Sequence, residues 1–319
     1  MLKKLEIKGL FGLYNYVLDF TDGDDSSLKI VTGPNGYGKT TLFQLIHALF
    51  RKDVTVFFSV PFASIAFHID GDIILVNQHR EVSEVYENSD LPPDETISVS
   101  FELVEPDTGK IVPMLEFSSA QGKQEIYGPL ELLLNSFKCF FLTDERILIR
   151  KSEQGERELS SASTHSMESM AETVAKIVSS DSKQPGIELF KELVAFFRFS
   201  NKEMILDKTF GIRFRMNNAS RTMIPVSAIS SGEKHLLLQL FELIFSGRSG
   251  DLVMIDEPEL SFHPAWLNEY VSVLEKIQRF KREEGREMQI ILATHSPVLI
   301  GERWNDTLDL YNLRKNDQH

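Results

Sequence analysis

The sequence has 319 residues, 42% of them hydrophobic and 25% charged, which suffices for a sizeable core in one large domain or two ordinary ones. Its formal net charge of −13 argues against a broad nucleic-acid-binding surface, although it is compatible with a local basic groove. No apolar run approaches a membrane span, the N-terminus lacks the apolar core of a signal peptide, and the single cysteine, Cys139, fits a reducing compartment. We therefore expect a cytoplasmic protein that makes no membrane contact.

The first half of the chain shows the two-residue periodicity of β-strands around one strand–loop–helix unit. Residues 2–8 and 14–20 alternate apolar and polar side chains and predict two antiparallel strands. Residues 28–50 predict a strand, a glycine-rich loop and a helix. Two hairpins are expected over residues 62–78 and 96–117, because each has turn residues at its centre.

The second half alternates helices and strands after a polar stretch. Residues 138–149 predict a buried strand that leads into a loop, and we expect the polar segment 150–185 to be mobile, with a helix over about 166–178. The remaining elements are expected as a helix at 187–199, short strands within 208–230, a helix at 232–246, a strand at 251–257, a helix at 264–283, a strand at 288–296 and a short tail. The patterns together predict an α/β fold with a mostly parallel central sheet, an antiparallel β subdomain and a helical lobe.

The segment GPNGYGKT, residues 33–40, has the spacing of a phosphate-binding loop between a strand and a helix. Its glycines let backbone N–H groups point at phosphates, Lys39 would reach the β- and γ-phosphates, and the Thr40 hydroxyl would ligate Mg²⁺. ATP with Mg²⁺ is therefore the expected ligand. The candidate nucleotide-binding residues of this loop are Asn35, Gly36, Tyr37, Gly38, Lys39, Thr40 and Thr41.

Two further apolar strands end in polar residues that suit the same chemistry. In LVMIDEPE, residues 252–259, Asp256 would complete the Mg²⁺ site and Glu257 would act as general base toward the attacking water. In ILATHS, residues 291–296, His295 would contact the γ-phosphate or the water. A solvated acidic turn and a structural histidine are the alternatives, but parallel strands would bring all three motifs to one edge of the sheet.

The segment ISSGEKH, residues 229–235, has the composition of a second anion-binding helix start. Ser230 or Ser231 would cap the helix, and Gly232 would allow close approach of a ligand. A simple helix cap is the alternative. Because the loop at 33–40 already has its own phosphate donors, the second cradle would be redundant unless it faced another nucleotide.

In this order, the four motifs resemble those of the ATP-binding-cassette ATPases, and within them the soluble heads of the SMC, RecF and overcoming-lysogenization-defect group. The resemblance implies a head-to-tail homodimer or higher homo-oligomer that sandwiches ATP. Ser231 and Gly232, with Glu233 beside them, would then contact the γ-phosphate held by a partner. Leu260, Ser261 and His263 would lie near the dimer interface, and Phe11 or Tyr14 would stack on adenine.

The resemblance also implies a division of the single domain 1–319. Residues 1–149 and 250–319 would form a nucleotide-binding lobe, and 150–249 a helical lobe with the signature motif. The glutamine expected after the strand at 138–149 is missing, since Asp144, Glu145 and Arg146 stand there, and Gln78 is a second candidate. Arg146 matches an arginine common at this point in the overcoming-lysogenization-defect branch.

Three functions fit these features. The sequence shows no coiled-coil arm and no acidic nuclease domain after residue 296, so we expect the head to act on a separate effector, a nuclease by analogy with the Septu and PARIS anti-phage systems. A RecF-like repair ATPase that binds duplex DNA is the alternative, for which the basic stretches 210–221 and 279–286 would be either DNA contacts or solvated faces. A transporter subunit fits less well, because the span from residue 33 to residue 232 contains hairpins that a compact transporter head does not need.

Overall fold

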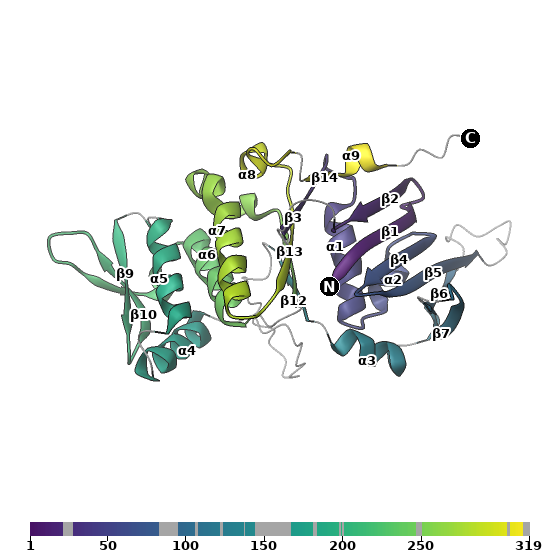
Figure 1. The fold of residues 1–319 in the computed structure, drawn as a ribbon. Coiled ribbons are helices and arrows are strands. Elements are labelled where there is room, and N and C mark those ends of the chain that lie inside the picture. The colour runs from purple at the N-terminus through teal and green to yellow at the C-terminus, as the bar shows by residue number, and fades with distance from the viewer. Residues whose placement is uncertain are drawn as a thin grey trace, which may run out of the picture.

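The computed structural model describes an α/β protein with three sheets, which confirms the predicted fold class (Figure 1). All statements below concern its described residues, namely 1–21, 28–82, 95–105, 108–121, 124–136, 138–143, 167–180, 184–197, 199, 201–246, 251–304 and 307–314. The mobile behaviour expected for 150–185 and the candidates Asp144, Glu145 and Arg146 fall wholly or partly outside them.

A parallel sheet forms the centre of the molecule, with strand order β14-β3-β13-β12-β8 and every neighbouring pair parallel. Strands β3, β12 and β13 are buried along their whole length, as expected of parallel strands that are covered on both faces. The strands are β3 (Leu28–Thr32), β8 (Cys139–Leu142), β12 (Asp251–Asp256), β13 (Met288–Ala293) and β14 (Thr307–Asp309).

A six-stranded antiparallel sheet, with order β2-β1-β4-β5-β6-β7, lies on one side of the centre together with the first helices (Figure 1). The predicted N-terminal strand pair and both predicted hairpins are confirmed by its pairings. The elements are β1 (Leu2–Leu10), β2 (Tyr14–Asp19), β4 (Ser64–Ile69), β5 (Asp72–Val82), β6 (Glu95–Val104), β7 (Ile111–Ser118), α1 (Lys39–Phe50), α2 (Thr55–Ser59) and α3 (Pro129–Asn135).

The opposite side consists of helices and a three-stranded antiparallel sheet, with order β11-β10-β9 (Figure 1). The helix predicted at 264–283 is confirmed as α7. The elements are α4 (Met167–Ser180), α5 (Pro185–Phe196), β9 (Lys202–Asp207), β10 (Gly211–Met216), β11 (Met223–Pro225), η2 (Val226–Ala228), α6 (Ser231–Phe241), the π-helix η3 (Glu242–Ser246), η4 (Pro258–Leu260), α7 (Pro264–Glu283) and α8 (Pro297–Ile300). The last helix, α9 (Leu310–Leu313), lies on the side of the six-stranded sheet, in contact with β2 (Figure 1).

The central sheet separates two hydrophobic cores. Met254 and Ala293 point into the core shared with α1 and the six-stranded sheet. Their chain neighbours Ile255 and Leu292 point into the core formed by the helices of the other side. Because successive strand residues face opposite sides and both faces are covered, the central strands are mostly apolar, and the polar side chains that follow their carboxyl ends gather at one edge of the sheet.

Two parts of the sheet differ from expectation. The strand predicted to be buried at 138–149 is described as only four residues, β8, of which Phe141 alone is buried, because β8 forms an edge of the sheet. The expected tail contains β14, which pairs with β3 from Thr307 to Asp309. Three residues are too few to show a periodicity, so their pairing depends on the neighbouring strand rather than on local sequence.

Candidate functional site

The loop at residues 33–38 joins the buried strand β3 to α1, which begins at Lys39. Gly33, Gly36 and Gly38 have φ values of 146°, 84° and 88°, a region that side chains rarely adopt. At Gly38 an added Cβ would also lie 2.9 Å from the Leu10 side chain of the six-stranded sheet. The backbone path of the loop therefore needs glycine at these positions. Asn35 and Gly36 are exposed at its tip.

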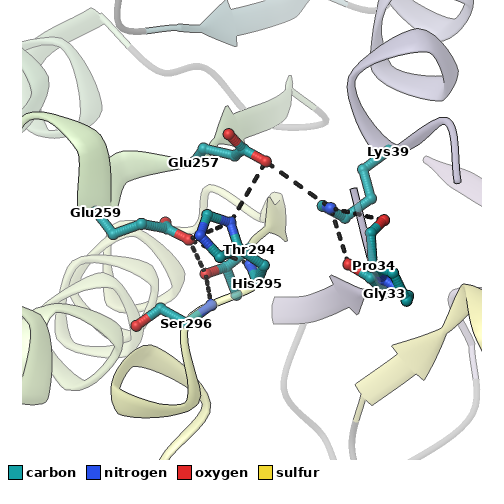
Figure 2. Close-up of polar contacts among 8 residues, drawn as sticks. All are labelled: Gly33, Pro34, Lys39, Glu257, Glu259, Thr294, His295 and Ser296. Atoms are coloured by element: carbon teal, nitrogen blue, oxygen red, sulfur yellow. Dashed lines mark hydrogen bonds and ion pairs between the residues drawn. The ribbon is translucent and has the colours of Figure 1, made fainter. Parts of the chain in front are cut away.

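The Lys39 ammonium group is buried and folds back onto the loop. It donates to the carbonyl oxygens of Gly33, at 2.9 Å, and of Pro34, at 3.4 Å. It also lies 3.8 Å from Oε1 of Glu257, so the loop and the end of β12 meet through this lysine (Figure 2). The two carbonyl contacts give the ammonium group hydrogen-bond acceptors within the loop itself.

Asp256 ends β12 and has a vacant acceptor beside Thr40. The residue is 8% exposed, and its Oδ1 has no hydrogen-bond partner among the described residues. Burial raises the pKa of this carboxyl, and a hydrogen bond from Thr40 opposes the rise. An unpartnered carboxylate oxygen next to a threonine hydroxyl fits Mg²⁺, which takes one or two protein oxygens and completes its shell with phosphate and water. Within the described chain no cluster of three or more His, Cys, Asp or Glu side chains could hold a metal.

Glu257 follows in a strained backbone conformation. Its φ of 44° and ψ of 54° are left-handed, which costs a residue other than glycine about 1–3 kcal/mol. Its N–H group donates to the carbonyl of Ala293 at 2.9 Å, so β13 holds the turn in place. The turn directs Oε1 to a point 3.8 Å from Lys39 and 3.5 Å from Nδ1 of His295 (Figure 2).

His295 follows β13 and lies between two carboxylates. Its Nδ1 is 3.5 Å from Oε1 of Glu257 and 3.3 Å from Oε1 of Glu259 (Figure 2). Glu259 has no role in the motifs recognised from the sequence, although its position three residues after Asp256 could have suggested one. The edge of the sheet thus brings Lys39, Glu257 and His295 into one cluster and adds Glu259 to it.

An open hollow of about 750 Å³ adjoins this cluster. One face of α1 forms a wall with Thr40, Gln44, His47 and Arg51, which are spaced three or four residues apart. Asp256, Glu257 and Leu260 are among the other lining residues. The hollow therefore opens directly onto the candidate magnesium ligands and the candidate base.

The signature segment forms the N-terminus of α6 through a capping box. Ser230 accepts a hydrogen bond from the backbone of Glu233, whose carboxylate accepts the N–H and hydroxyl of Ser230 at 2.9 and 2.8 Å. Lys202 of β9 forms an ion pair with the same carboxylate at 2.8 Å. Burial alone would raise the pKa of Glu233, but the hydrogen bonds from Lys202 and Ser230 lower it below the ordinary value. Glu233 is thus engaged within the chain, whereas Ser231 is exposed.

A second hollow, of about 1210 Å³, lies beside this segment. Ser230, Gly232 and Glu233 line it together with Ser261 and His263. Among the described residues, only Leu260, which is 62% exposed, lines both hollows. Within a single chain, the signature segment and the candidate magnesium ligands therefore line different hollows.

The two candidates for adenine stacking belong to the β1–β2 hairpin, which lies next to the loop at residues 33–38. Phe11 is 38% exposed, and its ring would be 3.5 Å from a Cβ at Gly38. The Tyr14 ring stacks on Tyr37 of the loop with a centroid distance of 5.3 Å. Tyr37 also accepts a hydrogen bond from Arg314 at 3.4 Å. Phe11 is thus the more accessible ring, and Tyr14 belongs to an aromatic cluster.

Gln78, the described candidate for the missing glutamine, has a structural role. Its amide donates to the carbonyl oxygens of Phe57 and Val60 at 2.6 and 2.9 Å, and its Oε1 accepts the N–H of Phe62. These bonds attach β5 to α2 and to the segment that connects α2 to β4. Gln78 is not among the described residues that line the hollow beside Thr40.

Several basic side chains of the two stretches are engaged within the chain. In the stretch at 210–221, Arg213 and Arg215 form ion pairs with Asp207 and Glu203. In the stretch at 279–286, Lys281 is 1% exposed and donates to a backbone carbonyl of the π-helix, and Arg286 lies 3.7 Å from Glu284. These contacts favour the interpretation of solvated faces over that of phosphate contacts.

Part of the chain matches a known protein family. Residues 143–301 match a family described as "AAA domain, putative AbiEii toxin, Type IV TA system". This stretch is similar to an AAA-type P-loop ATPase domain. It contains Asp256, Glu257 and His295 but begins after the loop at 33–40. No curated protein sequence matches the chain.

Two solved structures of SMC heads are similar to the chain over 94% of its length and 90% of theirs. One is an Smc head bound to the C-terminal winged-helix domain of ScpA, with 16% identity and a TM-score of 0.47. The other is an Smc head domain with an extended coiled coil bound to the C-terminal domain of ScpA, derived from Pyrococcus furiosus, with 14% identity and a TM-score of 0.45. In the described part of the chain, no helix combines the length and apolarity needed to cross a membrane.

Proposed function

We propose that the protein binds ATP with Mg²⁺ and hydrolyses it as a head-to-tail dimer. The observation that carries this proposal is the meeting of Lys39, Glu257 and His295 beside the unpartnered Oδ1 of Asp256. Phosphoryl transfer to water needs a phosphate-binding loop, a metal site and a group that orients or deprotonates the water. All three requirements have a candidate within this one cluster.

Each side chain has its own task in the proposal. The N–H groups of residues 33–40 would bind phosphate oxygens, and Lys39 would exchange its loop carbonyls for the β- and γ-phosphates. Thr40 and Asp256 would hold Mg²⁺, which neutralises phosphate charge when it is bound. Glu257 would accept the proton of the attacking water, and His295 would orient that water or the γ-phosphate.

The dimer in the proposal follows from the two separate hollows. Ser231 is exposed at the first residue of α6, in a segment that lines a different hollow from the candidate magnesium ligands. A nucleotide held by a second copy would give this helix start an anion to bind. Because Glu233 is engaged by Ser230 and Lys202, direct contact with that nucleotide would come from Ser231 and Gly232, and Glu233 would act by holding the helix start.

We further propose that the dimer regulates a separate effector, a nuclease in bacterial anti-phage defence being our specific hypothesis. The family description that matches residues 143–301 names a toxin of a toxin–antitoxin system, which supports a place among bacterial effector systems. The alternative of direct duplex binding is not favoured, because Arg213 and Arg215 are paired and the net charge is −13. Mass spectrometry of the natively purified complex would identify an effector chain.

Phosphate release from ATP by the full chain tests the enzymatic part. We expect release that requires Mg²⁺ and that is abolished in Lys39→Ala, which should also lose nucleotide affinity. A wild-type protein without Mg²⁺-dependent release, or a Lys39→Ala variant with the wild-type rate, would disprove it. The exposed Lys191, which pairs with Glu188 on α5, provides the matched control Lys191→Ala.

A further inference from the structure

Glu259 connects the segment after β12 to the segment after β13. Its Oε1 accepts the hydroxyl of Thr294 at 2.6 Å and the N–H of His295 at 3.1 Å. The same oxygen lies 3.3 Å from Nδ1 of His295 (Figure 2). One carboxylate oxygen therefore meets the backbone and the ring of His295 and the side chain before it.

Burial of the Glu259 carboxylate costs folding free energy. Its side chain is 8% exposed, and the second oxygen, Oε2, has no hydrogen-bond partner in the described part of the chain. A buried carboxylate loses hydration that its partners must replace, and here only one of its two oxygens is satisfied. A purely structural link would be served as well by an uncharged amide. The position thus points to a use for the negative charge.

The negative charge faces the histidine ring. Carboxylate oxygens accept hydrogen bonds and do not donate them, so Glu259 and Glu257 together favour a proton on Nδ1 of His295. The other ring nitrogen, Nε2, is then left for the reaction. The hydroxyl of Thr294 helps to fix the position of the Glu259 carboxylate. It donates a hydrogen bond to Glu259 and accepts one from the N–H of Ser296 at 2.9 Å.

We propose that Glu259 is a positioning residue that sets the orientation and the Nδ1-protonated form of His295, and through it the position of Glu257. The proposal rests on the proposed function, because it assumes that His295 and Glu257 act on ATP. Glu259 itself touches neither Lys39 nor Thr40 in the structure, so it acts through His295.

Steady-state kinetics of two substitutions provide the first test. In Glu259→Ala, kcat should fall about 10- to 100-fold, the range found when a side chain that orients a functional histidine is removed, while nucleotide affinity changes less than about 3-fold. Glu259→Gln keeps an acceptor for Thr294 and the His295 N–H but loses the charge, so it should retain part of kcat. Glu188→Gln, at an exposed ion pair on α5, is the matched control. An unchanged kcat in Glu259→Ala, or an equal loss of affinity, would overturn the proposal.

A double-mutant cycle separates positioning from general damage. If Glu259 acts through His295, adding Glu259→Gln to His295→Ala should lower kcat no further. A kcat of the double variant that falls by the product of the two single effects would contradict this. Thr294→Val, which removes only the hydroxyl, should cause a smaller fall in kcat with the same affinity, and it covers the case in which Glu259→Ala does not fold.

The ring of His295 gives a readout that does not depend on ATP hydrolysis. In protein labelled with nitrogen-15 histidine, the His295 signal, assigned by its loss in His295→Ala, should report a proton on Nδ1 in the wild type. Glu259→Gln should reduce that form. If the wild type fails to hydrolyse ATP but Glu259→Gln changes the ring, the proposed function fails and the positioning stands. If the ring is unchanged, the positioning fails whatever the ATPase result.

Discussion

The carbonyl oxygen of Ser261 occupies the space that a side chain at Gly232 would need. A Cβ atom there would lie 2.7 Å from that oxygen, and the obstacle is backbone rather than the end of a flexible side chain. The start of α6 and the segment after β12 therefore pack directly against each other. Gly232 has a reason to be glycine within the chain, separate from any nucleotide on a partner.

Gly232→Ala and Ser231→Ala should distinguish the packing role of Gly232 from the proposed nucleotide contact of Ser231. The added methyl group forces a backbone shift, so we expect a loss of about 1–3 kcal/mol of unfolding free energy, measured by denaturant titration. Ser231→Ala adds no atom at an exposed position and should leave stability within about 0.5 kcal/mol while slowing ATP turnover. Equal stability of Gly232→Ala and wild type would show that the packing is not tight.

The sequence was sufficient to predict which strand ends meet at the candidate site, because those motifs are local in the chain. The glycine loop, the Asp-Glu pair and His295 each follow an apolar strand, and parallel pairing brings strand ends together. The link through Glu259 could not be read in this way, because its partner Thr294 is 35 positions away and acidic residues in such loops are usually solvated. The clash at Gly232 and the pairing of β14 with β3 likewise depend on contacts that no short window contains.

Glu257→Gln should abolish turnover while preserving nucleotide binding. The amide cannot accept the proton of the attacking water, and general-base catalysis contributes about 100- to 10,000-fold, so kcat should fall by at least about 100-fold. The variant keeps the shape of the side chain and should accumulate as a nucleotide-bound dimer, detected by light scattering with ATP. Hydrolysis at the wild-type rate would show that Glu257 is not the base.

Asp256→Asn tests the magnesium site. The amide oxygen is a weaker ligand than the carboxylate whose Oδ1 is unpartnered, so Mg²⁺ should lose most of its effect on ATP affinity. We expect the thermal stabilisation by ATP with Mg²⁺ to approach that by ATP with a chelator in this variant, whereas the two differ in the wild type. If Mg²⁺ stabilises Asp256→Asn as strongly as the wild type, Asp256 is not a ligand.

The capping box should make stability depend on pH. The folded pKa of Glu233 is lowered from the ordinary value of 4.5, so its contribution to stability is complete above that value and is lost as pH falls through the lowered pKa. The difference in unfolding temperature between wild type and Glu233→Gln should therefore be largest at neutral pH and shrink below about pH 4.5. Glu192→Gln, at an exposed ion pair with Lys276, is the control. The same difference at pH 3 and pH 7 would contradict the assignment.

Ser231→Arg provides the direct test of the sandwich. Ser231 is exposed beside Gly232, outside the hollow lined by the candidate magnesium ligands, so a large side chain there should leave ATP binding by a single head within about 3-fold of wild type. In a dimer the same side chain would collide with the loop and nucleotide of the second copy. We expect Ser231→Arg to stay monomeric with ATP, even when it is combined with Glu257→Gln, and to lose hydrolysis. Ser231→Ala should still dimerise, and an unchanged rate in Ser231→Arg would mean that each head hydrolyses ATP alone.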